Sequence, residues 1–364
     1  MGSTIMACGS KAFVTFLILS WSTKGHADIA CRNDDGQPVD WFIAYKLPGR
    51  AKGNLKGLQY LYMDPSTNGW TTGKYLINDT RNAVAQTLLP LYKNPTYENE
   101  DFGYLVYNDQ PPRNMSITGH RETEEELPVS ASYGHSKGVI LLDTKTGIWL
   151  IHSTPKFPAQ KNYTWPSNAV RNGQSFICVT YPYDQFKDIG EQLRYIHPYC
   201  YYCSLPETYP ASLQCAASAG CYPNYPPWQR QVSLMTVGQN KFVSFAKYSR
   251  FGDDLYSGWL ANALRDNLLV ESWVKVRGRL PTNCSMKYHV YNVKEIQIHK
   301  DIKFKSTTDH SKWCITEGQE KWTCIGGLNR NKKASRRGGG VICTDNSLVW
   351  KIFQSSVKVK EPCP

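Results

Sequence analysis

Short alternations of hydrophobic and polar residues dominate the chain and predict strands joined in hairpins. Two stretches instead place apolar residues at helical spacing. One runs from Ala83 to Leu89 behind a cap at residues 78–80, and the other runs over residues 255–264 behind Asp253 and Asp254. Both helices are expected to face a core. The pattern therefore predicts a mixed protein of sheets with a few helices.

The N-terminal end predicts a secretory signal peptide. Lys11 precedes an apolar run over residues 12–21, and small residues follow at Gly25, Ala27 and Ala30. We expect cleavage near Ala27, which leaves residues 28–364 as the mature chain. Beyond this run no apolar stretch approaches the roughly 18 residues that a membrane-spanning helix needs.

Composition narrows the class of protein. The chain has 364 residues, of which 41% are hydrophobic and 20% charged, which excludes a disordered chain, a collagen-like fibre and a coiled coil. Its formal net charge of +12 favours polyanionic partners. Cationic secreted proteins are common, however, so charge alone indicates nucleic acid only weakly.

Sequons and cysteines agree with a secretory route. The predicted glycosylation sites are Asn78, Asn114, Asn162 and Asn283. Cys8 leaves with the signal, and the cysteines that remain are expected to form disulfides with one thiol left over. For Cys200, Cys203, Cys215 and Cys221 we favour local disulfides over a zinc site or a redox pair. These four lie in a proline- and tyrosine-rich stretch that predicts a loop-rich insertion or a linker.

One tripeptide occurs twice, as His135-Ser136-Lys137 and as His310-Ser311-Lys312. Each copy opens a predicted hairpin with a tryptophan, Trp149 or Trp322, in the returning strand. Residues i and i+2 of a strand share a face, so each copy presents an imidazole beside an ammonium group. If the two halves meet about a pseudo-twofold axis, two histidines and two lysines converge.

That set suits a phosphodiester. Lysines offset the charge on the phosphate, one neutral histidine attacks phosphorus, and the other histidine protonates the leaving oxygen, without any requirement for metal. A purely structural role, with each histidine bonded to a local carbonyl and each lysine solvated, is the better reading of one copy. Two matched copies in a basic secreted chain favour catalysis.

The copies and their surroundings resemble the deoxyribonuclease II family of the phospholipase D superfamily, which carries paired His-x-Lys motifs. The matching segments are residues 36–48, 105–112, 134–138, 251–261, 309–313 and 337–340, so the resemblance runs from about Cys31 to Cys363. It implies an α/β fold (mixed α+β) of two phospholipase D-like halves, each a mixed sheet flanked by helices, that form one catalytic unit. We place the halves at about 28–185 and 230–364, with the insertion at about 195–228.

The resemblance implies hydrolysis of DNA at acid pH without metal or other cofactor, leaving a 3'-phosphate and a 5'-hydroxyl. It makes His135 and His310 catalytic and Lys137 and Lys312 phosphate-binding, and we assign His135 as the nucleophile and His310 as the general acid. It also implies the disulfides Cys31–Cys178, Cys284–Cys363 and Cys324–Cys343, with Cys314 single. The superfamily places an acidic residue beyond each lysine. Glu317 has that spacing and Asp143 stands one place too far, and both are better explained as turn residues.

A basic stretch follows the second motif. Asn329 is a candidate phosphate or orienting contact, and the charges after it make a candidate rail for the DNA backbone, namely Arg330, Lys332, Lys333, Arg336 and Arg337. The alternative for the stretch is a solvated loop. Nothing in it suggests base readout, so we expect double-stranded DNA to be bound with little sequence preference.

Other function classes remain open. The same fold serves as a secreted DNA-binding protein or toxin if the reaction is lost or supplemented, and the superfamily chemistry also acts on phospholipids. Ribonucleases with similar residues use the substrate 2'-hydroxyl, which DNA lacks. The sequence leaves open whether the protein acts in a lysosome or outside the cell, and whether it is a monomer or a homodimer.

Overall fold

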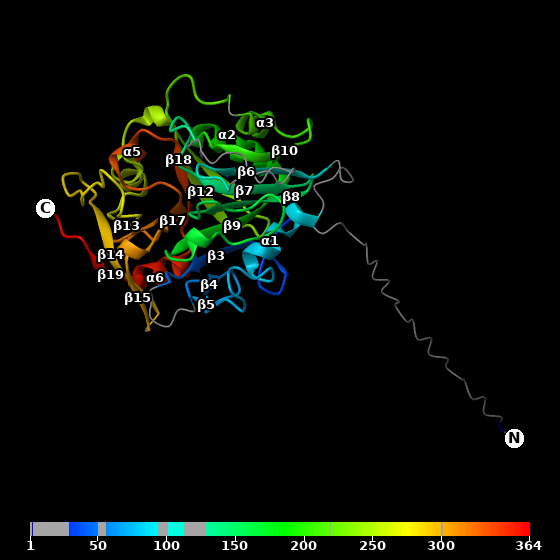
Figure 1. Cartoon of the computed structure of the whole chain (residues 1–364), viewed down its shortest axis with the longest axis horizontal. Helices are drawn as coiled ribbons and strands as arrows, with labels where there is room; N and C mark the ends of the chain where they lie inside the picture. The colour runs from blue at the N-terminus through cyan, green and yellow to red at the C-terminus, as the bar shows by residue number, and fades with distance from the viewer. Residues whose placement is uncertain are drawn as a thin grey trace.

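The computed structural model describes residue 2 and residues 29–49, 56–93, 101–112, 129–218, 220–299 and 301–364. The predicted signal peptide and Asn114 lie outside these residues. Two large sheets with a few helices form the molecule, which is therefore of the mixed α+β class that the sequence predicts (Figure 1). No helix in the described residues is long and apolar enough to cross a membrane.

The first sheet has eight strands, ordered β10-β6-β7-β8-β9-β3-β4-β5. All its pairs are antiparallel. Its strands are β3 (Trp41–Lys46), β4 (Tyr60–Met63), β5 (Thr71–Thr72), β6 (Gly103–Asn108), β7 (Lys137–Leu142), β8 (Thr146–His152), β9 (Gln174–Pro182) and β10 (Cys200–Ser204). Edge strand β10 comes from the segment that the sequence marks as an insertion. A separate short pair joins β1 (Cys31–Arg32) and β2 (Pro38–Val39).

The second sheet has nine strands, ordered β11-β12-β18-β17-β16-β13-β14-β15, with β19 also paired to β14. Only β13 and β14 run parallel. Its strands are β11 (Gln229–Met235), β12 (Lys241–Lys247), β13 (Leu268–Glu271), β14 (Val290–His299), β15 (Ile302–Lys305), β16 (Trp313–Thr316), β17 (Thr323–Gly326), β18 (Gly339–Thr344) and β19 (Val357–Lys360).

The helices are short. The α-helices are α1 (Ala83–Lys93), α2 (Phe186–Ile196), α3 (Ala211–Ala217), α4 (Ala261–Leu264), α5 (Lys332–Ser335) and α6 (Ser347–Ser356). A π-helical turn spans Tyr256–Leu260, and 3-10 turns span Ser167–Ala169, Tyr183–Gln185, Ser249–Phe251 and Ser306–Thr308. The cap of α1 is Asn82, whose Oδ1 accepts from the Ala85 amide (2.9 Å), and not residues 78–80. Asp254 caps the second predicted helix, because its Oδ2 accepts from the Ser257 amide (2.9 Å).

Both sheets contribute to one hydrophobic core. Trp149 of β8 and Trp313 of β16 are fully buried in the same cluster, together with residues of α2 and α6. Trp322, which the repeat pairs with Trp149, lies just before β17 and is only half-buried. The two hairpins are thus less alike than the sequence indicates. In the second hairpin, which is shorter, Trp313 takes the core position that Trp149 has in the first. The shared core holds the two sheets together at the place where the motifs meet.

Five disulfides cross-link the described residues. They include Cys31–Cys178, Cys284–Cys363 and Cys324–Cys343, the three pairs that the resemblance implies, and the local pairs Cys200–Cys203 and Cys215–Cys221. Cys314 is a buried free thiol whose pKa burial raises. Asn78 and Asn162 are exposed and Asn283 is half-buried, so glycosylation there stays a prediction.

Candidate active site

Each His-Ser-Lys motif stands at the entrance to a strand and is fixed by the other half of the chain. The His135 amide donates to the carbonyl of Gly338, just before β18, at 2.9 Å. The His310 amide donates to the carbonyl of Gly173, just before β9, also at 2.9 Å. The reciprocal bonds place both histidines on the seam between the sheets, as a pseudo-twofold arrangement requires.

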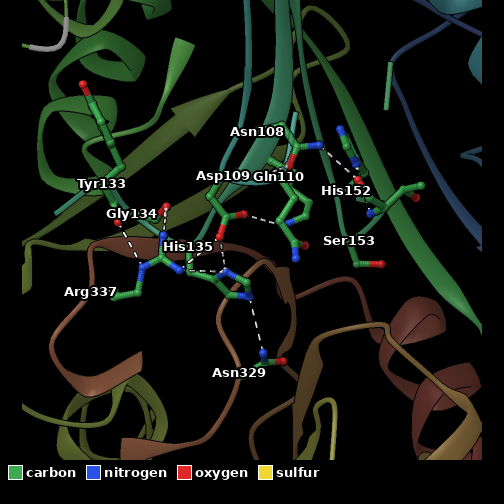
Figure 2. A network of polar contacts seen from close by, with 12 residues as sticks. Asn108, Asp109, Gln110, Tyr133, Gly134, His135, His152, Ser153, Asn329 and Arg337 are labelled. Atoms are coloured by element: carbon green, nitrogen blue, oxygen red, sulfur yellow. Dashed lines mark hydrogen bonds and ion pairs between the residues drawn. The ribbon is translucent and has the colours of Figure 1, made fainter. Parts of the chain in front are cut away.

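Strand register brings a carboxylate to the first motif. Asn108, the last residue of β6, pairs with Lys137 in β7, so the next residue, Asp109, lies beside the motif. Its amide donates to the Ser136 carbonyl (3.2 Å). His135 Nδ1 lies 2.6 Å from Asp109 Oδ2, and the Lys137 ammonium pairs with the other oxygen of the carboxylate. Figure 2 shows the His135 ring between Asp109 and Asn329.

Arg337 completes this cluster. Its Nη1 lies 3.0 Å from Asp109 Oδ2, and its Nη2 donates to the Gly134 carbonyl (3.0 Å) (Figure 2). Burial alone would raise the pKa of the Asp109 carboxyl, but the hydrogen bond from His135 and the charges of Lys137 and Arg337 outweigh it and hold that pKa well below its usual range. Asp109 is therefore an ionised carboxylate.

An ionised carboxylate can only accept, so the Nδ1–H of His135 donates to Asp109. Nε2 is then left with its lone pair, and the Asn329 amide nitrogen lies 3.3 Å from it. Burial lowers the pKa of His135 to about 4, with Lys137 and Arg337 acting in the same direction against Asp109. His135 is therefore a neutral imidazole at the lining of the cleft, with Asn329 beside its Nε2.

The second motif has different neighbours. His310 Nδ1 lies 3.0 Å from the Ser153 carbonyl oxygen and 3.3 Å from Gln174 Oε1. Both are acceptors and favour the proton on Nδ1, but a donor also lies beside this nitrogen. The Lys312 ammonium lies 3.0 Å from the same Nδ1 and also donates to the His310 carbonyl. In the described residues, no carboxylate contacts this imidazole.

Burial and nearby cations lower the pKa values of both His310 and Lys312. Burial lowers the pKa of His310 well below its usual range, and the charges of Lys312 and Lys137 add to the effect. Burial also lowers the pKa of Lys312, as does the charge of Lys137. Charges of the first motif thus act on both groups of the second, so the two motifs converge on one site.

Acidic groups lie behind the second motif, but their burial outweighs the effect of the nearby Lys312 charge. Ser311 Oγ donates to Asp309 Oδ2 (2.6 Å), and the Tyr45 hydroxyl also bonds to Asp309. Burial raises the pKa of Asp309, and burial with the charge of Asp309 raises that of Glu271. These acids therefore hold the loop of the second motif in place and do not act as counter-ions comparable to Asp109.

A cleft of about 900 Å³ opens at the first motif. Its lining includes His135, Asn329 and the segment from Asn331 to Arg337, with Ala131, Gly252 and Val276 on other loops. Part of the segment forms helix α5. The Lys247 side chain holds the end of this helix by donating to the carbonyls of Ala334, Ser335 and Arg337. Lys332, Lys333 and Arg336 are exposed along this wall.

Two residues of the predicted DNA rail, Arg330 and Arg337, are bound to other groups of the protein. Arg330 is 2% exposed, and its Nε pairs with Asp254 Oδ2 (3.2 Å) while its Nη1 donates to Asn292 Oδ1 (2.9 Å). Its expected role on the DNA rail is corrected to a buried structural ion pair, because β17 carries the chain inward before α5 returns to the surface. Arg337 lines the cleft, but its guanidinium bonds to Asp109 and to the Gly134 carbonyl.

The structure also brings in residues that the sequence reasoning did not assign. Asp109 lies in the segment 105–112 that matches the family, and it directly follows an apolar strand. This position is the sequence feature that could have indicated Asp109 as a site residue. Ser153 acts through its backbone carbonyl, which no side-chain pattern marks. Asp143 accepts from the Thr146 amide (2.8 Å) in a hairpin turn, and Glu317 pairs with Lys360 on the surface.

One group of residues has the spacing of metal ligands. Within the described ranges these are Cys284, His289 and Cys363, and the two sulfurs form a disulfide with each other. The disulfide explains why the two cysteines of this group lie close together.

Comparisons with known proteins agree on one family. The family model described as Deoxyribonuclease II matches residues 30–363. Deoxyribonuclease-2-alpha of Mus musculus is 42% identical over 344 residues, which cover 92% of this chain and 94% of the relative. Deoxyribonuclease-2-beta of Homo sapiens is 38% identical, covering 97% and 96%. Plancitoxin-1 of Acanthaster planci is 37% identical, covering 96% and 97%.

Proposed function

The chain belongs to the deoxyribonuclease II family, and from that premise we propose that it is an acid endonuclease that hydrolyses DNA phosphodiester bonds where its two halves meet. One observation carries the proposal. Two imidazoles, each held at Nδ1 by polar groups, share a site with two lysines and an arginine. Such a site can supply a nucleophile, a proton and charge stabilisation to one phosphate.

In the first step Nε2 of His135 attacks phosphorus, and the bond from phosphorus to the 5'-oxygen breaks. The electron pair goes to that oxygen, which takes the proton from Nε2 of His310. The resulting phosphohistidine carries a positive charge on its ring, and the Nδ1–H bond to Asp109 stabilises that charge. Lys137, Lys312 and Arg337 supply positive charge near the phosphate, so the scheme includes no metal step.

In the second step water attacks the phosphohistidine while neutral His310 accepts a proton from the water. The phosphorus–nitrogen bond breaks, its electron pair returns to Nε2 of His135, and a 3'-phosphate is released. His310 leaves the cycle protonated, as it entered. The 5'-hydroxyl product formed in the first step.

Acid pH follows from the proton that His310 must carry. Burial and neighbouring cations hold its pKa well below 6.5, so the charged form gains population only as pH falls. A bound phosphodiester anion raises that pKa by adding negative charge beside the ring. Activity should therefore decrease as pH rises from 5 to 7.5.

Lys332, Lys333 and Arg336 are the proposed contacts to the DNA backbone. They lie exposed along the cleft that opens at His135. Contacts of lysine and arginine with phosphates carry no sequence information, which supports cleavage with little sequence preference.

Plasmid nicking by the purified mature protein at pH 5 and pH 7.5, with EDTA throughout, tests the function. Cleavage at pH 5 that survives EDTA is expected, with much less at pH 7.5. Absence of cleavage by a folded protein would refute the proposal and turn attention to phospholipid substrates. Cleavage only after a divalent metal is added would refute its metal-independent part.

A second candidate function is that of a secreted toxin, favoured by the similarity to Plancitoxin-1 of Acanthaster planci. The disulfides support a route through an oxidising compartment, to a lysosome or out of the cell. Applying wild type and the His310→Ala variant to cultured cells tests this candidate. Toxicity of wild type alone would tie it to the nuclease reaction, whereas harmless wild type would exclude it.

A further inference from the structure

The loop after β13 joins the second motif to the wall of the cleft. Near its start, the Trp273 ring meets the His310 imidazole edge-on, with ring centroids 5.3 Å apart. Further along, Val276 lines the cleft. The loop then bonds to the basic segment, since the Lys332 amide donates to the Gly278 carbonyl (2.9 Å). One short loop thus connects His310 with the proposed DNA-binding wall.

Trp273 differs from the tryptophans of the core. Trp149 and Trp313 are fully buried, whereas Trp273 is half-buried although it touches a catalytic imidazole. The exposed Lys275 holds its ammonium 5.9 Å from the centre of the Trp273 ring. An indole with a partly exposed surface and an exposed cation beside it suits a nucleotide, because the ring stacks on a base while the cation meets a phosphate.

We propose that Trp273 and Lys275 form the subsite for the nucleotide on the leaving side of the scissile bond, where the indole stacks on the nucleobase and the ammonium contacts the next phosphate. This inference rests on the proposed function, because His310 defines the leaving side as the donor of the proton to the 5'-oxygen. Trp273 contacts His310, so the nucleoside whose oxygen is protonated is the one within reach. Stacking accepts any base, in agreement with weak sequence preference.

A comparison of two single-stranded oligonucleotides tests the subsite. One is intact, and the other carries an abasic deoxyribose on the leaving side of a chosen bond. With an end label, cleavage of that bond is followed at pH 5 in EDTA. Wild type should cut the abasic strand about 10-fold more slowly, in line with the value of base–aromatic stacking. Trp273→Ala should lose about the same factor on the intact strand and almost nothing further on the abasic strand.

Trp273→Phe should keep part of the discrimination, because a smaller ring still stacks. Trp322 offers a matched control, since it is also half-buried with a lysine, Lys241, 5.8 Å from its ring centre. Trp322→Ala should change both strands by the same factor.

An equal loss on both strands in Trp273→Ala would overturn the subsite, because the indole would then only support His310. Coupling to an abasic residue on the other side of the bond, in the nucleotide that keeps the 3'-phosphate, would overturn the leaving-side assignment. If wild type cut neither strand, the proposed function would fall and the subsite with it. That outcome differs from normal cutting without coupling, which removes the subsite alone.

Discussion

The two His-Ser-Lys motifs have the same residues and opposite surroundings. Behind His135 stands an ionised carboxylate, Asp109, shared with Lys137 and Arg337. Behind His310 stand a backbone carbonyl and an amide oxygen, while the acids further back have raised pKa values. The comparison teaches that the group bonded to Nδ1, and not the tripeptide, sets what each imidazole can do.

A carboxylate on Nδ1 stabilises positive charge on the ring, which a phosphohistidine carries throughout its lifetime. A neutral carbonyl holds the ring in place without favouring the charged form, so His310 gives up its proton readily once it is protonated. The asymmetry therefore favours His135 as nucleophile and His310 as acid. The following experiments break or sharpen that difference.

The largest effect should come from removing either imidazole. His135→Ala and His310→Ala should each lower kcat on DNA by at least about 10³-fold, because each deletes a group that forms or breaks a bond in the transition state. Plasmid nicking at pH 5 measures both. His289→Ala is the control, since this histidine bonds to Tyr291 far from the motifs in sequence. Normal nicking by either active-site variant would exclude the two-histidine mechanism.

The groups behind Nδ1 should matter unequally. Asp109→Asn should lower kcat by about 10²-fold or more, because an amide holds the ring but cannot stabilise its charge. Gln174→Ala should cost only a few-fold, since the Ser153 carbonyl still orients His310. Asp143→Asn, in a hairpin turn, should have no effect. Equal losses for Asp109→Asn and Gln174→Ala would remove the proposed asymmetry.

Stability should decline with acid through the same histidine. The pKa of His135 is about 4 in the folded protein against about 6.5 unfolded, so the unfolded state takes up the proton first as pH falls. The contribution is complete above pH 6.5 and is lost between pH 6.5 and about 4, by about 3 kcal/mol. Urea unfolding at several pH values should show a smaller decline for His135→Gln than for wild type. An unchanged pH dependence in that variant would contradict the buried neutral imidazole.

The smallest effects on DNA binding are expected for the surface cations that are proposed to contact the DNA backbone. Lys332→Ala, Lys333→Ala and Arg336→Ala should each weaken DNA binding a few-fold and reduce the slope of log affinity against log salt by about 1. Arg330→Ala is a sharp contrast, because it breaks a buried pair and should cost about 3 kcal/mol of stability. A salt-slope change in Arg330→Ala without loss of stability would restore it to the DNA contact surface.

Sequence patterns pointed to the two histidines and two lysines that the structure brings together, because a repeated i, i+2 spacing is visible in the sequence itself. They missed Asp109 because its approach to His135 depends on the pairing of β6 with β7, a contact between residues distant in sequence. They placed Arg330 on the surface because a run of charges does not reveal which side chain turns inward to Asp254. The cap of α1 was placed too early because both Asn78 and Asn82 are suitable capping residues.

The assignment of the two histidines is tested most directly with a substrate that needs no acid. In a thymidine 3'-phosphodiester with p-nitrophenol in place of the 5'-nucleoside, the leaving phenolate departs without a proton. His310→Ala should release the first equivalent of p-nitrophenolate within about 10-fold of the wild-type rate while remaining inactive on DNA, and His135→Ala should cleave neither. Cleavage by His135→Ala but not by His310→Ala would contradict the account and exchange the two roles.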